Sequence, residues 1–266
     1  MTDNSIKTAT QANKAAWEAS APLHGTGEDW DRLLAAAGKP GFSVLDDSLT
    51  DTLKTIGIDG RRAVQIGCNN ARELLSLAAL GGVPALGIDQ AAGFLDQGRQ
   101  LAQAANLTPT LLEADIYDLP DGLGTFDLAL ITIGVLNWMP DLEGFFAVVA
   151  GLMAPGAALV IYETHPFMEV FDPTADTPFE PAFSYFDRRP HISAETITYD
   201  GIDHGEGAPS HWFIHTLGDI VSACIRSGLT LDRLTEHPYS IREPDYDIYE
   251  GRAAQIPMSY TLVARR

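Results

Sequence analysis

The sequence is poor in cysteine and in basic residues, and each shortage excludes certain kinds of protein. Only two cysteines, Cys68 and Cys224, occur among 266 residues, so we expect no disulfide framework, and a reducing cytoplasm fits the chain. Seventeen lysines and arginines stand against 36 aspartates and glutamates, which gives a formal net charge of −19. Because such a surface repels phosphates and anionic lipids, we predict no nucleic-acid partner and no membrane partner.

The sequence also lacks a long uninterrupted apolar segment and any metal-ligand pattern. The longest uncharged stretch, residues 145–162, is divided by Pro155 and Gly156, and neither half is long enough to cross a bilayer. Residues 1–20 are polar and contain no apolar core of a signal peptide. Cysteine and histidine show no spacing typical of a metal site. We therefore predict a soluble, cytoplasmic protein without a bound metal.

The remaining composition is that of a globular protein. Apolar residues make up 45% of the chain and charged residues 20%, which are the shares of a chain with a packed core. A length of 266 residues suffices for one large domain, or for a domain with a small lobe. Strand-like and helix-like segments alternate regularly from residue 61 to residue 162. This alternation predicts an α/β fold in which helices cover both faces of a parallel sheet.

Segments of different character flank and interrupt this alternation. Residues 1–57 carry apolar side chains at helical spacing and predict an N-terminal helical cap. Residues 163–215 contain six prolines and many aromatics, and they are too long for a plain connection. We interpret them as an inserted lid with an antiparallel strand pair near residues 195–199 and 210–214. Residues 58–162 and 216–266 would then form the core.

One strand–turn–helix segment indicates where a ligand would bind. An apolar strand, residues 63–66, ends at Gly67, and a polar turn and a leucine-rich helix follow. In an open α/β sheet, ligands bind at the carboxyl end of such a strand, against the free N–H groups of the helix. Asp89 lies 22 residues after Gly67, at the end of the next apolar strand. A carboxylate there can accept hydrogen bonds from both hydroxyls of a ribose.

At these residues the chain resembles the class I S-adenosylmethionine-dependent methyltransferases. The loop of that family reads acidic-x-Gly-x-Gly-x-Gly, and the ribose-binding acid follows it; residues 65–71 here read Gln-Ile-Gly-Cys-Asn-Asn-Ala, with one of the three glycines and a glutamine in place of the acid. The resemblance implies a Rossmann-like, doubly wound, seven-stranded sheet that is mostly parallel and has an antiparallel last strand. It also implies S-adenosyl-L-methionine as cofactor and S-adenosyl-L-homocysteine as product.

The resemblance assigns the cofactor to residues that follow four of the strands. Asp89 would bind the ribose, Asp115 the adenine amino group, and Asn69 and Arg72 the amino-acid end. Asparagine tolerates left-handed backbone conformations, so Asn69 can stand in for a missing glycine. The complete predicted cofactor-binding set is Gln65, Gly67, Asn69, Arg72, Asp89, Gln90, Asp115, Ile116, Thr132 and Ile133.

Catalytic residues are harder to predict, because methyl transfer from a sulfonium depends mainly on the alignment of the reacting atoms. A general base is needed only when the acceptor carries a proton of high pKa. We predict that a base or orienting group comes from His165, Asn137 and Tyr199, and that the acceptor contacts Trp17, His24, Trp138, Tyr185 and His191. Such side chains also pack helices and loops, and this structural interpretation stays open for each of them.

The leading hypothesis is an enzyme: an S-adenosylmethionine-dependent methyltransferase that acts on a small-molecule acceptor by in-line transfer. The missing loop glycines favour an alternative, a non-catalytic S-adenosylmethionine-binding module or an inactive partner subunit. A nicotinamide-dependent oxidoreductase would share the strand, turn and acid, but it needs Gly-x-Gly-x-x-Gly, which residues 67–72 do not provide. The sequence leaves open whether oxygen, nitrogen, carbon or sulfur is methylated, and it leaves open the oligomeric state.

Overall fold

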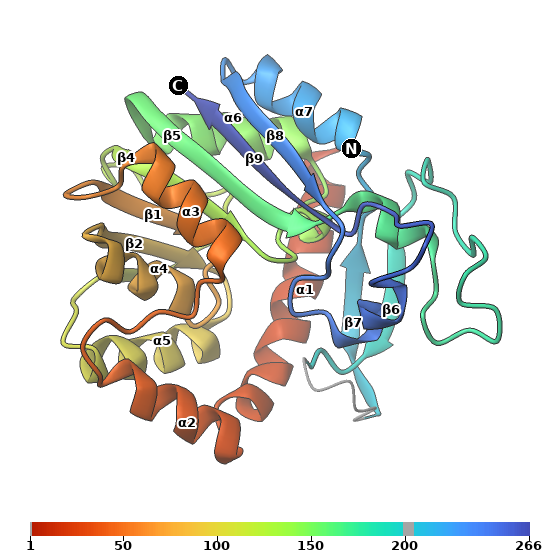
Figure 1. Cartoon of the computed structure of the whole chain (residues 1–266), viewed down its shortest axis with the longest axis horizontal. Helices are drawn as coiled ribbons and strands as arrows, with labels where there is room; N and C mark the ends of the chain where they lie inside the picture. The colour runs from red at the N-terminus through yellow and green to blue at the C-terminus, as the bar shows by residue number, and fades with distance from the viewer. Residues whose placement is uncertain (1, 199–204) are drawn as a thin grey trace.

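The computed structural model describes residues 2–198 and 205–266, and a seven-stranded sheet organises them (Figure 1). The strand order is β3-β2-β1-β4-β5-β9-β8. The strands are β1 (Arg62–Ile66), β2 (Val83–Asp89), β3 (Thr110–Glu113), β4 (Phe126–Thr132), β5 (Met153–Thr164), β8 (Thr230–His237) and β9 (Ser259–Arg265). Strand β9 runs antiparallel to both of its neighbours, and the other neighbouring pairs are parallel. The predicted fold class is therefore confirmed.

Helices cover both faces of this sheet. One face carries α3 (Asp47–Ile56), α4 (Arg72–Ser76) and α5 (Ala92–Ala104), with the short 3₁₀ helix η1 (Leu77–Leu80), and the other carries α6 (Leu142–Leu152) and α7 (Leu217–Arg226). Leu53 and Leu74 pack on Leu128 on the first face, and Phe145 packs with Ile131 on the second. Because the central strands are buried on both faces, they read in the sequence as continuous apolar runs.

An N-terminal helix crosses the edge of the sheet at which β1, β2 and β4 end. Helix α1 (Asp3–His24) lies between the sheet and a hairpin of β6 (His191–Glu195) and β7 (Glu206–Trp212), as Figure 1 shows. Helix α2 (Gly27–Ala37) follows, and its Trp30 packs against Leu101 of α5. The predicted N-terminal helices are thus present, and the first of them reaches the edge where ligands bind in this architecture.

Two segments without regular sheet pairing pack together beyond β5. The segment after β5 contains the 3₁₀ helix η3 (Pro166–Val170), and the connection from β8 to β9 contains η4 (Pro244–Tyr249). Tyr249 of this connection packs against Met168 and Met258. The predicted antiparallel pair is present, but it joins β6 to β7, so its first strand begins four residues before the expected position.

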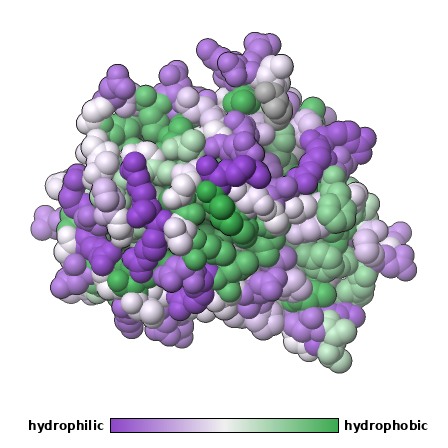
Figure 2. Space-filling model, turned by 90° about the horizontal axis from the view of Figure 1, so that it is seen from above, coloured by the Kyte–Doolittle hydropathy of each residue, from purple (hydrophilic) through white to green (hydrophobic). Residues whose placement is uncertain are grey.

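The surface mixes charged regions with local apolar areas. Figure 2 shows hydrophilic side chains around much of one face and an apolar area near its centre. Phe179, Phe183 and Phe186, which lie between β5 and β6, are exposed, and so is Ile192 of β6. Within residues 2–198 and 205–266, no helix has both the length and the apolar character that a membrane span requires.

Candidate functional site

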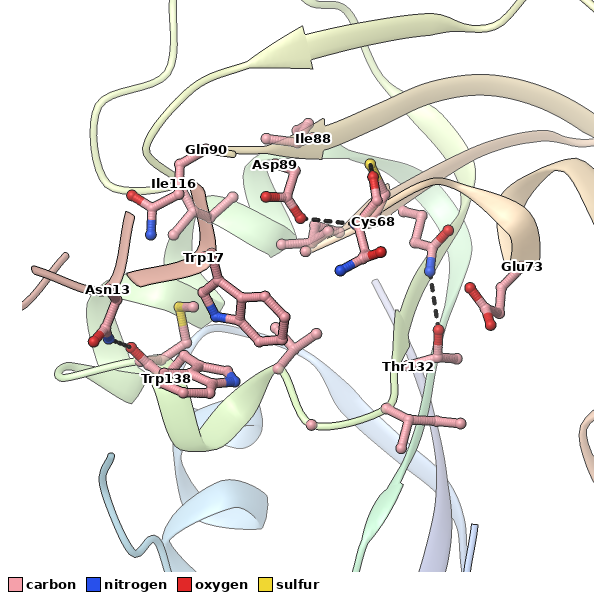
Figure 3. A pocket seen from close by; sticks show the side chains of 18 of the residues that line it. Asn13, Trp17, Cys68, Glu73, Ile88, Asp89, Gln90, Ile116, Thr132 and Trp138 are labelled. Atoms are coloured by element: carbon pink, nitrogen blue, oxygen red, sulfur yellow. Dashed lines mark hydrogen bonds between the residues drawn. The ribbon is translucent and has the colours of Figure 1, made fainter. Parts of the chain in front are cut away.

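A cavity of about 370 Å³ lies where the carboxyl ends of β1, β2 and β4 meet. Its walls come from the loop after β1, the residues after β2, β3 and β4, one side of α1, and residues 242–244 between β8 and β9. Figure 3 shows Trp17 and Trp138 side by side at one end of the cavity and Glu73 toward the other end. Cavities of this size hold small organic ligands.

The loop after β1 has the backbone of a glycine-rich turn although it contains one glycine. Gly67 has a φ of 63°, and Asn69 and Ala71 have φ values of 49° and 58°. Asparagine adopts this left-handed conformation more readily than most residues. A Cβ on Gly67 would lie 2.8 Å from Cγ2 of Val135, in the loop after β4. The glycine is therefore needed for the contact between these two loops.

Asp89 is fixed by the backbone at the end of β2. Its Oδ2 accepts a hydrogen bond from the N–H of Asn69 (2.7 Å), and its Oδ1 accepts one from the N–H of Ala91 (3.0 Å). Burial raises the pKa of this carboxyl, and the N–H donors oppose that rise. A carboxylate has about four acceptor positions, so both oxygens of Asp89 can accept a further hydrogen bond from a ligand in the cavity.

The glutamine that replaces the acid of the resembling family joins three elements. Gln65 of β1 donates through Nε2 to Oγ1 of Thr132 on β4 (2.9 Å), and its Oε1 accepts from the N–H of Leu74 in α4 (3.0 Å). Gln65 and Thr132 are both buried. A neutral amide can form hydrogen bonds to both of these neighbours, and no charge has to be buried.

Two arginines and one glutamate form the end of the cavity opposite the tryptophans. Glu73 is buried; its Oε1 accepts a hydrogen bond from Nε of Arg72 (3.0 Å) and also pairs with Nη1 of Arg242. Burial opposes the ionisation of Glu73, but the charges of Arg72 and Arg242 outweigh burial and lower its pKa. Two cations share one carboxylate, so this end of the cavity is suited to an anionic group.

Helix α1 is tied to the opposite end of the cavity by a buried asparagine. Asn13 donates to the backbone oxygens of Trp138 (3.3 Å) and His211 (3.0 Å), and it accepts from the N–H of His211 (2.6 Å). The rings of Trp17 and Trp138 meet edge to face at 5.4 Å, and Trp212 meets Trp138 at 4.7 Å. Residues from α1, β7 and the 3₁₀ helix η2 (Leu136–Trp138) are therefore held together here.

A buried glutamate at the end of β5 fixes the loop after β4. Glu163 accepts hydrogen bonds from the N–H groups of Gly134 and Val135, the second at 2.9 Å. Burial raises the pKa of Glu163 to about 7. The carboxyl thus orders the backbone that forms one wall of the cavity.

The structure brings the predicted cofactor-binding residues together. All of them line the cavity: Gln65, Gly67, Asn69, Arg72, Asp89, Gln90, Asp115, Ile116, Thr132 and Ile133. Of the predicted acceptor-binding residues, Trp17 and Trp138 also line it.

The other predicted acceptor residues lie outside the cavity lining. Nε2 of His24 is hydrogen-bonded to the oxygen of Ile197 (2.9 Å), and the hydroxyl of Tyr185 accepts from the N–H of Leu217 (2.9 Å). The ring of His191 packs edge to face on Phe183. Their observed partners are thus those of side chains that hold loops and helices in place.

The predicted catalytic residues do not gather at the cavity. His165 is buried at the N-cap of η3, where its Nδ1 accepts from the N–H of Phe167 (3.0 Å) and its Nε2 lies 3.0 Å from Oε1 of Glu236. Asn137 is in η2, its backbone oxygen accepts from the N–H of Phe213, and its side chain does not line the cavity. Tyr199 lies outside the described residues. The placement of His165 and Asn137 gives no support to a catalytic role for either.

Several cavity residues were not predicted from the sequence. Thr10 and Asn13 reach the cavity from α1, and Arg242, Glu243 and Pro244 reach it from the connection between β8 and β9. No motif marks these positions, because they approach the loop after β1 only through the folding of distant segments.

The comparisons with known proteins agree with this architecture. Residues 63–156 match a family model described as a methyltransferase domain. The chain carries a methyltransferase domain. This match confirms the family predicted from the loop after β1, and no curated protein matches the chain.

Solved structures show the same fold at low sequence identity. A putative S-adenosylmethionine-dependent methyltransferase from Listeria monocytogenes is 15% identical over 81% of this chain and 96% of its own, with a TM-score of 0.60. An S-adenosylmethionine-dependent methyltransferase from Mesorhizobium loti is 21% identical over 81% of this chain and 96% of its own, with a TM-score of 0.56. Magnesium protoporphyrin IX methyltransferase from Synechocystis PCC 6803, with bound S-adenosylhomocysteine, is 16% identical over 99% of this chain and 100% of its own, with a TM-score of 0.58. The methyltransferase domain thus has the fold of the S-adenosylmethionine-dependent enzymes.

Proposed function

We propose that this methyltransferase uses S-adenosylmethionine to methylate a small-molecule acceptor by in-line displacement. The observation that supports the proposal is the single cavity around which the predicted cofactor-binding residues meet, beside a pair of tryptophans. S-adenosylmethionine supplies a methyl group activated on a sulfonium. The chain contributes binding, alignment and the exclusion of water.

The chemistry of the cavity walls fits this cofactor along its length. The carboxylate of Asp89 retains acceptor capacity for the ribose hydroxyls after its two bonds to backbone N–H groups. Asp115 and Ile116 line the cavity next to it and suit an adenine. The pair Arg72 and Arg242, which share Glu73, suits the carboxylate of the methionine end.

A small molecule fits the acceptor side better than a macromolecule does. Helix α1 lines the tryptophan end of the cavity with Thr10, Asn13 and Trp17, and Asn13 binds this helix to His211 of β7. We propose that residues 1–57 and residues 163–215 act as the cap and the lid over the acceptor. The net charge of −19 disfavours nucleic acid as the acceptor. Cys68 and Cys224 are buried free thiols, which fits a reducing compartment such as the cytoplasm.

Calorimetry with S-adenosylmethionine and S-adenosylhomocysteine tests the cofactor assignment. We expect specific binding of both, and Asp89→Ala should weaken it by about tenfold or more, because hydrogen bonds between the sugar and a charged group are lost. Asp96→Ala, which removes an exposed carboxylate on α5, is the matched control and should leave binding unchanged. If the wild-type protein binds neither compound, the proposed function is wrong. Binding without transfer to any acceptor would favour the non-catalytic module.

A further inference from the structure

One carboxylate in the cavity wall has no partner among the described residues. Glu243 follows β8, and its backbone oxygen accepts hydrogen bonds from Oγ of Ser240 (3.0 Å) and from the N–H of Tyr246 (3.0 Å). These bonds fix its backbone, while the side chain makes no hydrogen bond and no ion pair within residues 2–198 and 205–266. The cavity carboxylates of Glu73 and Asp89, by contrast, are both engaged.

The surroundings of Glu243 are negatively charged. Glu169 and Glu163 act on it from η3 and β5, and Asp245 acts from its own segment. The neighbouring cation, Arg242, is paired with Glu73. Burial, followed by the charges of Glu169, Glu163 and Asp245, raises the pKa of Glu243 to about 7. A carboxylate with such a pKa can accept and release a proton near neutral pH.

Three indole rings in contact with one another connect the cavity to Glu169. Trp17 meets Trp138, and Trp138 meets Trp212, each edge to face. Nε1 of Trp212 then donates to Oε2 of Glu169 at 2.7 Å. Indole faces and carboxylates both attract cations, whereas a carboxylate or a phosphate of the acceptor beside Glu243 and Glu169 would be repelled.

The other ionisable groups of the cavity are less suited to act as a base. Cys68 is buried, and burial raises its pKa far above neutrality. Asp89 and Asp115 accept backbone N–H groups and lie on the side proposed for adenosine. None of the histidines in the described parts of the chain lines the cavity. Glu243 is therefore the remaining carboxylate that faces the cavity without another partner.

We propose that Glu243 is the general base of the reaction and that the acceptor is an amine that enters as an ammonium ion. This inference rests on the proposed function. Glu243 takes a proton from the ammonium, and the freed lone pair on nitrogen forms the new N–CH₃ bond. The S–CH₃ bond breaks, and its electron pair stays on sulfur as the neutral thioether. The charge of the sulfonium thus passes to the methylated nitrogen.

The substitution Glu243→Gln tests whether Glu243 is the base. The control is Asp247→Asn, which removes an exposed carboxylate of the same segment. Acceptors of matched shape that carry an aliphatic amine, a phenol, a thiol or a carboxylic acid are compared. We expect the wild type to methylate the amines, and we expect Glu243→Gln to lower kcat about 100-fold or more. Its affinity for S-adenosylmethionine should stay within about twofold of the wild type.

The pH profile separates a base from a structural residue. The wild-type kcat/KM should rise through a limb near pH 7 that Glu243→Gln lacks, and the variant should recover at high pH, where the amine loses its proton to solvent. The inference is overturned if phenols or carboxylic acids are methylated and amines are not, or if Glu243→Gln keeps the kcat of Asp247→Asn. Binding of S-adenosylmethionine without methylation of any amine overturns it too and leaves the cofactor assignment intact. No cofactor binding at all would instead contradict the proposed function.

Discussion

At the scale of single residues, the cavity is built from positions directly after the parallel strands and from positions in the connection between β8 and β9. Gly67, Asp89 and Asp115 come directly after apolar runs that the sequence shows plainly, and parallel strands bring such positions to one edge. Arg242 and Glu243 come from a connection with no motif, and they reach the cavity only because β8 and β9 lie beside β5 in the sheet.

Gly67→Ala should destabilise the protein more than Gly57→Ala does. Both glycines have positive φ values, so either substitution costs on the order of 1 kcal/mol of backbone strain. A Cβ on Gly67 would also lie 2.8 Å from Val135, whereas nothing lies within 4 Å of one on Gly57. We expect Gly67→Ala to cost about 2–3 kcal/mol in denaturant unfolding.

The double variant Gly67→Ala/Val135→Ala identifies the origin of the difference. Removing the two Cγ methyls of Val135 should relieve the part of the destabilisation that comes from the steric clash and leave the part that comes from the strain of the positive φ. If Gly67→Ala and Gly57→Ala lower the unfolding free energy equally, the close contact between the two loops is contradicted.

At the scale of elements, local signals predicted helix ends well and strand register poorly. The sequence Thr216-Leu217-Gly218-Asp219 predicts a capping box, and both of its hydrogen bonds are present at the start of α7. The strands β6 and β7 were expected several residues away from their observed positions, because their pairing is fixed against α1. Asn13 and the backbone of His211 form that contact, and the two residues are far apart in the sequence.

Asn13→Ala should loosen α1 from the cavity. The substitution leaves the N–H and the oxygen of His211 and the oxygen of Trp138 without this partner, which costs about 1–3 kcal/mol of unfolding free energy. Hydrogen exchange should speed up in α1 and β7 and stay unchanged in β1. Gln11→Ala, on the exposed face of the same helix, is the control. If Asn13→Ala matches the control in both measurements, α1 is held by other contacts.

At the scale of the whole molecule, several buried carboxyls make stability depend on pH. Glu163, Glu169 and Glu243 all have pKa values raised to about 7, chiefly by burial. Between pH 4.5 and 7 the folded protein holds protons that the unfolded chain has released, so this contribution to stability falls as pH rises. Burial also lowers the pKa of His165, His215 and His237, and their contribution changes in the opposite direction, since it is lost as pH falls below about 6.5.

Glu169→Gln isolates the carboxyl contribution, because the histidines are the same in both proteins. Glutamine can still accept from Nε1 of Trp212, so the unfolding free energies should be similar at pH 5. At pH 8 the variant should be more stable than the wild type by on the order of 2 kcal/mol, since it has no carboxyl at position 169 that must ionise in its buried site. Asp172→Asn is the control, because hydrogen bonds from Thr174 lower the pKa of this exposed carboxyl. The difference in unfolding free energy between this variant and the wild type should therefore not change between pH 5 and 8. If Glu169→Gln is instead less stable at pH 8, then Glu169 is ionised in the folded protein and a cation stabilises it.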